Sequence, residues 1–396
     1  MNIDRHRLSH TIDSLSPRDL VQRGSLKWSQ THPDTGAPLL GAGVAEHDLG
    51  VPECISDAIA RRVSDGTLGY LAPQWIDGMT EAFTGFCQRR YGWQFDPQCV
   101  HASPDVLSIF RVLIEQVSEP GDAIAVPTPA YWVFRVIPGQ LGRRLIDVPS
   151  RREGGKWVLD IDAIAAAVDA GAKVVVLCNP WNPVGRALTP AEMHAFAEAT
   201  VARGAWVFSD EIHAPLTLPG HRHVPFASLS EDYARLTVTA TAASKAFSIP
   251  GLTCAQAITT HPEAARVMAE PLAALPGIGT LGVAAAEAGY RDADDWLDFA
   301  AAYIAETLQE VRALIPTDSG IVMDEPEATY ISLWDAREAA QRRGYDSPYT
   351  RALDAGVMGN DGAGVGRGYE QFLRLNFGTS RRVAIEIATR VIAALS

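Results

Sequence analysis

Short apolar runs alternate with helical stretches through the middle of the chain. Four of these runs are bounded by Gly, Pro or Asp and are typical of buried strands: 123–126, 173–178, 205–208 and 236–240. Between them, the stretches 160–170 and 190–203 predict helices, and the second opens with Thr189 and Pro190, a cap followed by a first-turn proline. The repeated order of strand, helix and strand predicts a mainly parallel sheet that helices cover on both faces.

The last third of the chain has a different pattern. Stretches rich in Ala predict helices at 282–289 and 294–313, strands follow at 330–334 and 372–376, and a last helix covers 381–395. This order predicts a small α+β domain after a large α/β domain. We expect an N-terminal segment (1–50) that packs with the small domain, a large ligand-binding domain (51–288) and a small domain (289–396).

Composition and charge narrow the class of partner. A formal net charge of −13 over 396 residues argues against a nucleic-acid surface, because binding phosphate backbones requires clustered Lys and Arg. The five cysteines are scattered, and no apolar run approaches the roughly 20 residues of a membrane span. We expect a cytoplasmic protein with reduced thiols and a small-molecule ligand, and with neither nucleic acid nor a membrane as its partner.

Three segments that follow predicted strands carry candidate chemistry. Lys245 lies in 239–247, Asp210 ends the run 206–210, and Asn182 lies in 179–185. Taken singly, each has an ordinary explanation: a surface lysine, a helix cap and a turn. Taken together at the carboxyl ends of strands, they predict a pyridoxal 5′-phosphate (PLP) site. A lysine can bond the cofactor aldehyde, a carboxylate can hold the pyridinium nitrogen, and an amide can face the ring hydroxyl.

Longer stretches of the chain resemble a known family. The matching segments are 69–70, 130–134, 178–186, 209–230, 243–245 and 374–378. They are similar to fold-type I PLP enzymes of the class I/II aminotransferase group, and most similar to the MalY/PatB branch of cysteine-S-conjugate β-lyases (cystathionine β-lyases). The resemblance implies a large PLP-binding domain with a mainly parallel, seven-stranded sheet. It also implies a homodimer with shared active sites.

The resemblance assigns the contacts of the cofactor ring. Lys245 would carry the cofactor covalently and move the Cα proton, and Asp210 would pair with the pyridine nitrogen. Asn182, together with His213, would face the ring hydroxyl. Tyr131 would stack on the ring, although an aromatic side chain here is equally compatible with core packing.

The resemblance also assigns the phosphate and substrate contacts. Ser244 and the backbone around Val106 and Leu107 would hold the phosphate at a helix N-terminus, and Tyr70 would reach the phosphate of the other subunit as a catalytic and cofactor-binding residue. Arg374 would bind the substrate carboxylate, whereas the alternative for this residue is a surface salt bridge. Asn182 and Trp181 complete the expected substrate contacts.

Several positions depart from the family pattern. The usual Gly before Val106 is Asp105, which is unfavourable beside a phosphate unless its carboxylate points away or caps the helix. The segment 43–49 reads Gly-Val-Ala-Glu-His-Asp-Leu in place of a pattern that begins with Trp, and Ser248 and Trp181 stand where Asn and His are common. These changes border the expected substrate pocket, so they affect the substrate more than the cofactor.

Two other motifs carry less weight. His213, His221 and His223 are close in sequence, but the family stretch 209–230 accounts for them, and we expect no metal site. The run 362–368 resembles a dinucleotide-binding loop only loosely, and we expect a flexible loop next to Arg374.

The expected reaction is α,β-elimination from an L-cysteine S-conjugate, giving a thiol, pyruvate and ammonia. An aminotransferase uses the same opening steps and is an alternative. A second alternative is an oxidative, decarboxylating deaminase of a bulky S-cysteine conjugate in natural-product biosynthesis. A third, from another class, is a PLP-binding regulatory protein, although the sequence contains no helix-turn-helix or basic stripe.

Overall fold

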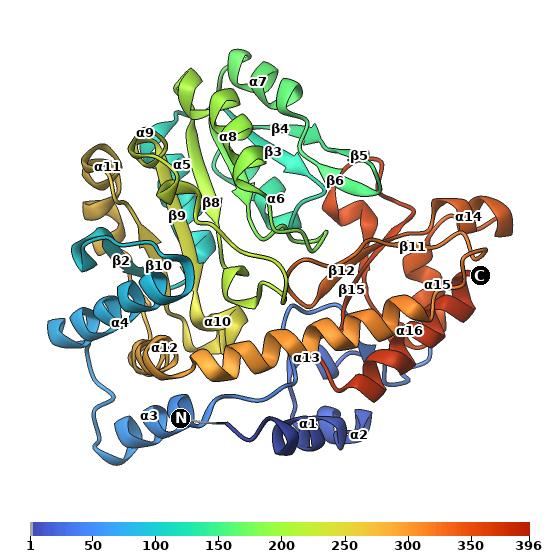
Figure 1. Ribbon diagram of the computed structural model, residues 1–396. Helices are drawn as coiled ribbons and strands as arrows, with labels where there is room; N and C mark the ends of the chain where they lie inside the picture. The colour runs from blue at the N-terminus through green and yellow to red at the C-terminus, as the bar shows by residue number, and fades with distance from the viewer. Residues whose placement is uncertain (1–2) are drawn as a thin grey trace.

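A seven-stranded sheet forms the centre of the larger part of the molecule (Figure 1). The computed structural model describes residues 3–396. In order across the sheet, the strands are β2 (Val100–Ser103), β10 (Ala255–Ile258), β9 (Thr237–Ala242), β8 (Trp206–Asp210), β7 (Ala172–Cys178), β3 (Ala123–Thr128) and β4 (Arg144–Pro149). Strands β4, β3, β7, β8 and β9 run parallel, and β10 is antiparallel to both of its neighbours. The prediction of a mainly parallel sheet is confirmed, and the four predicted strands are β3, β7, β8 and β9.

Helices cover both faces of this sheet because successive strand residues point to opposite sides. Ile124 and Val126 share a core with α5 (Val106–Val117), α6 (Trp132–Gln140) and α11 (Pro262–Ala273). Ala123 and Ala125 share the opposite core with α7 (Ile161–Asp169) and α8 (Pro190–Ala199). The predicted C-terminal end of the helix over 190–203 is wrong. The helix stops at Ala199, because Thr200 leaves helical geometry, and a 3₁₀ turn follows over Val201–Arg203.

A helical layer lies at the β2 edge of the large sheet (Figure 1). It contains α3 (Glu53–Ser64), α4 (Pro73–Tyr91) and α12 (Thr280–Asp292), and α12 packs against both of the others. Gly282 allows α12 to approach the chain closely, since a Cβ atom there would lie 1.9 Å from the Leu252 carbonyl oxygen. The predicted helix at 282–289 is thus part of a longer helix with a packing role.

The C-terminal part is built on a second, antiparallel sheet. Its strands, in order, are β11 (Val322–Met323), β12 (Ile331–Asp335), β15 (Phe372–Asn376) and β14 (Asn360–Asp361). The accompanying helices are α13 (Asp294–Ala313), α14 (Arg337–Arg343), α15 (Pro348–Asp354) and α16 (Arg381–Leu395). The long helix α13 runs from the large sheet to the C-terminal sheet (Figure 1). This part has the α+β composition that the sequence predicts.

The N-terminal segment lies against the C-terminal part. It begins with α1 (Arg5–Asp13) and α2 (Pro17–Gln22), and β1 (Leu40–Gly41) pairs in parallel with β13 (Val357–Met358). The remaining strands and α-helices of the described residues are the hairpin β5 (Arg151–Glu153) and β6 (Lys156–Val158), the short helix α9 (Glu231–Arg235), and α10 (Ala243–Ala246). No helix within residues 3–396 is both long and apolar enough to cross a membrane. The expected domain boundaries stay a prediction.

Candidate active site

The carboxyl ends of three neighbouring parallel strands bring the candidate residues together. In the register of the sheet, Cys178 of β7 lies opposite Asp210 of β8, which lies opposite Ala240 of β9. The segment that contains Asn182 follows β7, and Lys245 lies in α10, directly after β9. These ends border a cavity of about 860 Å³, and nearly all of the predicted site residues line it. Those that line it are Val106, Leu107, Tyr131, Asn182, Asp210, His213, Ser244, Lys245 and Arg374.

Lys245 is a half-buried amine whose charge has no carboxylate partner. Its Nζ donates a hydrogen bond to the Ala45 carbonyl oxygen at 3.0 Å, and no ion pair joins it to another residue within 3–396. Burial lowers the pKa of Lys245, and the nearby positive charge of Arg374 adds to this effect. A lysine that loses its proton more easily is a better nucleophile and a better proton acceptor.

Asp210 is a buried carboxylate at the end of β8. It accepts a hydrogen bond from the Ile212 backbone N–H at 3.2 Å, and the Cys178 thiol lies 3.6 Å away. Burial raises the pKa of Asp210 to about 6. Since no ion pair joins it to a cation within residues 3–396, a ligand with a protonated ring nitrogen fits this position.

Arg374 is a buried guanidinium bound by neutral groups. Its Nη1 donates to the Gly43 carbonyl at 2.8 Å and also to the Asn360 side chain, and its Nε donates to Asn182 Oδ1 at 3.2 Å. Burial lowers the pKa of Arg374 to about 10. The alternative of a surface salt bridge is wrong, because the side chain is buried and has no carboxylate partner among the described residues. A ligand carboxylate would supply the missing negative charge.

His213 lines the same cavity, and one of its ring nitrogens has no hydrogen-bond partner among the described residues. Its Nδ1 is 3.1 Å from Thr329 Oγ1, whereas Nε2 is buried without a hydrogen-bond partner. Burial and the charges of Lys245 and Arg374 lower the pKa of His213 to about 3, so the ring is neutral at physiological pH. Buried polar atoms usually have a partner. A ligand oxygen near Nε2 would satisfy this one.

The N-terminus of α5 forms another part of the cavity wall. The Asp105 carboxylate accepts hydrogen bonds from Ser108, at 2.8 Å from N and 3.0 Å from Oγ, and so caps its own helix. Because the Asp105 carboxylate caps the helix, an acidic residue is tolerated beside the expected phosphate position. The first backbone amides of α5, at Val106 and Leu107, together with the Ser244 hydroxyl, could hold an anionic phosphate.

Two predicted site residues do not line the cavity. Trp181 is buried in the core of the large domain, and its indole N–H donates to the Pro129 carbonyl at 2.8 Å. Trp181 therefore supports the chain that leads to Tyr131, but it does not face the ligand space. Tyr70 is fully exposed in the single chain, and its role toward another subunit stays a prediction.

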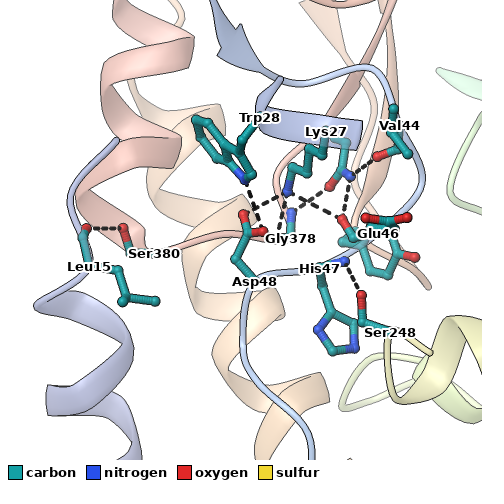
Figure 2. A network of polar contacts seen from close by, with 12 residues as sticks. Leu15, Lys27, Trp28, Val44, Glu46, His47, Asp48, Ser248, Gly378 and Ser380 are labelled. Atoms are coloured by element: carbon teal, nitrogen blue, oxygen red, sulfur yellow. Dashed lines mark hydrogen bonds and ion pairs between the residues drawn. The ribbon is translucent and has the colours of Figure 1, made fainter. Parts of the chain in front are cut away.

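Residues 43–45 line the cavity. A buried lysine anchors the segment 43–49, to which they belong (Figure 2). Lys27 is 1% exposed. Its Nζ donates to Asp48 Oδ2 at 2.8 Å, to the Gly378 carbonyl at 3.0 Å and to the Glu46 carbonyl at 3.2 Å. The indole N–H of Trp28 donates to the other Asp48 oxygen at 3.0 Å. These contacts fix the segment 43–49. Within it, the Ala45 carbonyl accepts the hydrogen bond from Lys245, and the Gly43 carbonyl accepts one from Arg374.

His47 and Ser248, two of the departures from the family pattern, contact each other (Figure 2). The His47 backbone N–H donates to Ser248 Oγ at 3.0 Å, and His47 Nε2 lies 3.0 Å from the Ala246 carbonyl oxygen. Burial lowers the pKa of His47 to about 4. The two changes therefore connect segment 43–49 with the chain just after Lys245.

The motifs that received less weight have structural roles. His223 Nε2 lies 2.9 Å from a Glu211 carboxylate oxygen, and within residues 3–396 no cluster of His, Cys, Asp or Glu could hold a metal ion. The run 362–368 was expected to be a flexible loop, but it begins with a 3₁₀ turn, Gly362–Val365, that Asp361 caps. Gly364 and Val365 line the cavity.

The fold and this site define a class of protein. A mainly parallel sheet with a lysine after β9 and a carboxylate at the end of β8 is the architecture of fold-type I PLP-dependent enzymes. The family model for class I and II aminotransferases matches residues 38–391, and the chain belongs to this family.

Individual relatives resemble the chain over nearly its full length. Cystathionine β-lyase PatB of Bacillus subtilis is 32% identical over 94% of this chain and 97% of its own. Cystathionine β-lyase of Corynebacterium glutamicum is 33% identical over 95% and 98%. A solved structure from Corynebacterium diphtheriae, provisionally named a PLP-dependent β-cystathionase, is 31% identical, covers 96% of this chain and 98% of its own, and has a TM-score of 0.85.

Proposed function

We propose that this protein is a PLP-dependent carbon–sulfur β-lyase that eliminates a thiol from L-cysteine S-conjugates. One observation carries the proposal: Lys245, Asp210 and Arg374 line one cavity, and none of them has an ion-pair partner within residues 3–396. The Lys245 amine suits an aldehyde carbon, the Asp210 carboxylate suits a protonated ring nitrogen, and the Arg374 guanidinium suits an amino-acid carboxylate. Two relatives named cystathionine β-lyase, 32–33% identical over almost the whole chain, support this choice of reaction.

The contacts of the cofactor ring follow from the described geometry. The Lys245 amine would bond the aldehyde carbon, and Asp210 would hold the ring nitrogen in its protonated form. The free Nε2 of His213 and the amide of Asn182 would face the ring hydroxyl, and Tyr131 would cover a face of the ring.

The phosphate contacts involve a second subunit in this proposal. Ser244 and the amides of Val106 and Leu107 would hold the phosphate from this chain. Tyr70 of the partner subunit would complete its binding, which makes a homodimer the active form. A cytoplasmic location belongs to the same proposal, and the free state of all five cysteines is compatible with a reducing compartment.

Arg374 positions the substrate for the reaction. Its guanidinium binds the α-carboxylate. Asn182 accepts a hydrogen bond from Arg374 and so orients the guanidinium group. This contact fixes which bond to Cα faces Lys245. Trp181 contributes indirectly, since its bond to Pro129 supports the loop before Tyr131.

Lys245 moves the proton in this mechanism. When bound, PLP supplies a conjugated ring that takes up the electron pair left at Cα. The lowered pKa of Lys245 increases the fraction of neutral amine, which removes the Cα proton. The Cβ–S bond then breaks with its electron pair on sulfur, and a thiolate needs no strong acid to leave. The released enamine takes up water and gives pyruvate and ammonia.

The test is an aerobic incubation of the purified holoenzyme with S-ethyl-L-cysteine, followed by mass spectrometry. Pyruvate and ethanethiol in equal amounts are the expected products. A keto acid that retains the sulfur would show transamination, and an aldehyde with carbon dioxide would show oxidative decarboxylation; either one would contradict the proposal. Lys245→Ala should lose both turnover and the visible absorbance of the bound cofactor. Normal turnover by this variant would refute the assignment of Lys245.

A further inference from the structure

The cavity has a wall beyond the reacting groups. Its volume of about 860 Å³, which includes the space for the cofactor, lies in the upper part of the range of roughly 300–1,000 Å³ that is typical of small-molecule pockets. Beyond Arg374, the wall consists of the N-terminal segment, α15 and the chain around β13 and β14. We call this region the distal subsite, and its side chains are Leu26, Gln30, Tyr349 and Met358.

The distal subsite adjoins the carboxylate-binding position. Asn360 pairs with Arg374 across β14 and β15, and Met358 lies two residues before Asn360 in β13. The Tyr349 hydroxyl lies 3.5 Å from the Met358 sulfur. An amino acid held by Arg374 would thus have the distal subsite within reach of its side chain.

The surface of the distal subsite is largely apolar. Leu26 is 61% exposed, although it is a large hydrophobic side chain. Tyr349 and Met358 are half-buried. Large apolar side chains that share an exposed wall of a cavity mark a surface for an apolar ligand, and Met adapts its shape to such ligands.

Gly43 lets the N-terminal segment approach the chain between β13 and β14 closely. A Cβ atom on Gly43 would lie 3.0 Å from the Gly359 carbonyl oxygen and 3.3 Å from that of Met358. A side chain at this position would therefore press on the backbone that carries Met358. The glycine preserves the position of this wall of the distal subsite.

The charges of the cavity argue against a second carboxylate in the substrate. Among its described lining residues, the basic side chains are Lys245, His213 and Arg374, and the reaction uses all three. The charged residue at the distal end is Asp361, an acid that would repel a carboxylate. Burying a carboxylate without a cation is costly. The thiol half of cystathionine carries such a carboxylate.

We propose that the distal subsite binds the thiol half of the substrate, and that this half is bulky, predominantly apolar and free of carboxylate groups. The inference rests on the proposed function and narrows it to one class of cysteine S-conjugate. Cystathionine is then a poor substrate, although it gives its name to several relatives.

Three conjugates test this inference on the holoenzyme: S-ethyl-L-cysteine, S-benzyl-L-cysteine and L-cystathionine. We expect kcat/KM for the benzyl conjugate to exceed that for each of the others by about tenfold or more. Leu26→Ala should lower the ratio of benzyl to ethyl activity, because it removes apolar contact area. Gln30→Arg should raise the activity with cystathionine relative to the benzyl conjugate. Its matched control, Gln30→Met, should not, since it adds no charge.

Each other outcome separates the inference from the proposed function. Cleavage of the ethyl conjugate without a preference for benzyl would overturn the inference alone. Efficient cleavage of cystathionine would also overturn the inference. If Arg367→Gln then abolished this cleavage, the exposed Arg367 would be the cation that binds the second carboxylate. Turnover of none of the three conjugates would overturn the proposed function itself.

Discussion

Replacing Lys27 with Met removes the cation that neutralises the buried Asp48 and keeps a side chain of similar length. Removing one partner of a buried ion pair costs about 3–5 kcal/mol of folding free energy. Several contacts limit the loss here to the lower end of that range. Asp48 keeps the hydrogen bond from Trp28, the Glu46 carbonyl keeps that from Asn376 Nδ2 at 2.7 Å, and the Gly378 carbonyl keeps that from the Asp48 amide at 2.8 Å. We expect a loss of ~3 kcal/mol.

The assay is equilibrium unfolding in urea, with the free energy of unfolding extrapolated to water. Lys173→Met is the matched control, because Lys173 is exposed and its replacement should change stability by less than about 0.5 kcal/mol. The double variant Lys27→Met with Asp48→Asn removes both charges, and it should recover more than about 1 kcal/mol relative to Lys27→Met. A loss below about 1 kcal/mol for Lys27→Met, or no recovery in the double variant, would refute the assignment of a buried ion pair.

Further predictions concern the site and its dependence on pH. Arg374→Gln should lower kcat/KM by about 2–5 kcal/mol, or roughly 30-fold to several thousandfold, because it removes a buried charge that faces the substrate carboxylate; steady-state kinetics would show this, and a change below threefold would contradict it. Asp210→Asn should lower kcat by about 10²–10³, since an amide cannot hold the ring nitrogen in its protonated form as a carboxylate does; single-turnover rates measure this, and an unchanged rate would exclude the assignment. The pKa of His47 is lowered to about 4 when folded, so the unfolded chain binds a proton at this residue that the folded chain does not. Stability should therefore fall as the pH drops from about 6.5 to 4, by up to ~1.4 kcal/mol per pH unit from this residue. His47→Met should make the acid limb shallower in urea titrations, and an identical slope would contradict this.

The sequence determined the central sheet and the cofactor end of the site. Asp210 and Lys245 follow apolar runs, and parallel strands end at the same edge of a sheet, so local pattern is enough to bring these residues together. The resemblance to a family added His213 and Arg374, which carry no local signal of their own. Their burial and their lack of an ionic partner became visible only in the structure.

Contacts between distant segments depended on the tertiary structure. No local pattern marks Lys27, which stands between Leu26 and Trp28, yet packing buries it against Asp48 and Gly378. Trp181 was expected at the substrate, but its indole points into the core. Local patterns record neighbours within a few residues, whereas the shape of the distal subsite depends on the pairing of β1 with β13, about 317 residues further along the chain. The sequence thus determined which cofactor the site suits, and the packing of the N-terminal segment decided the space left for the substrate.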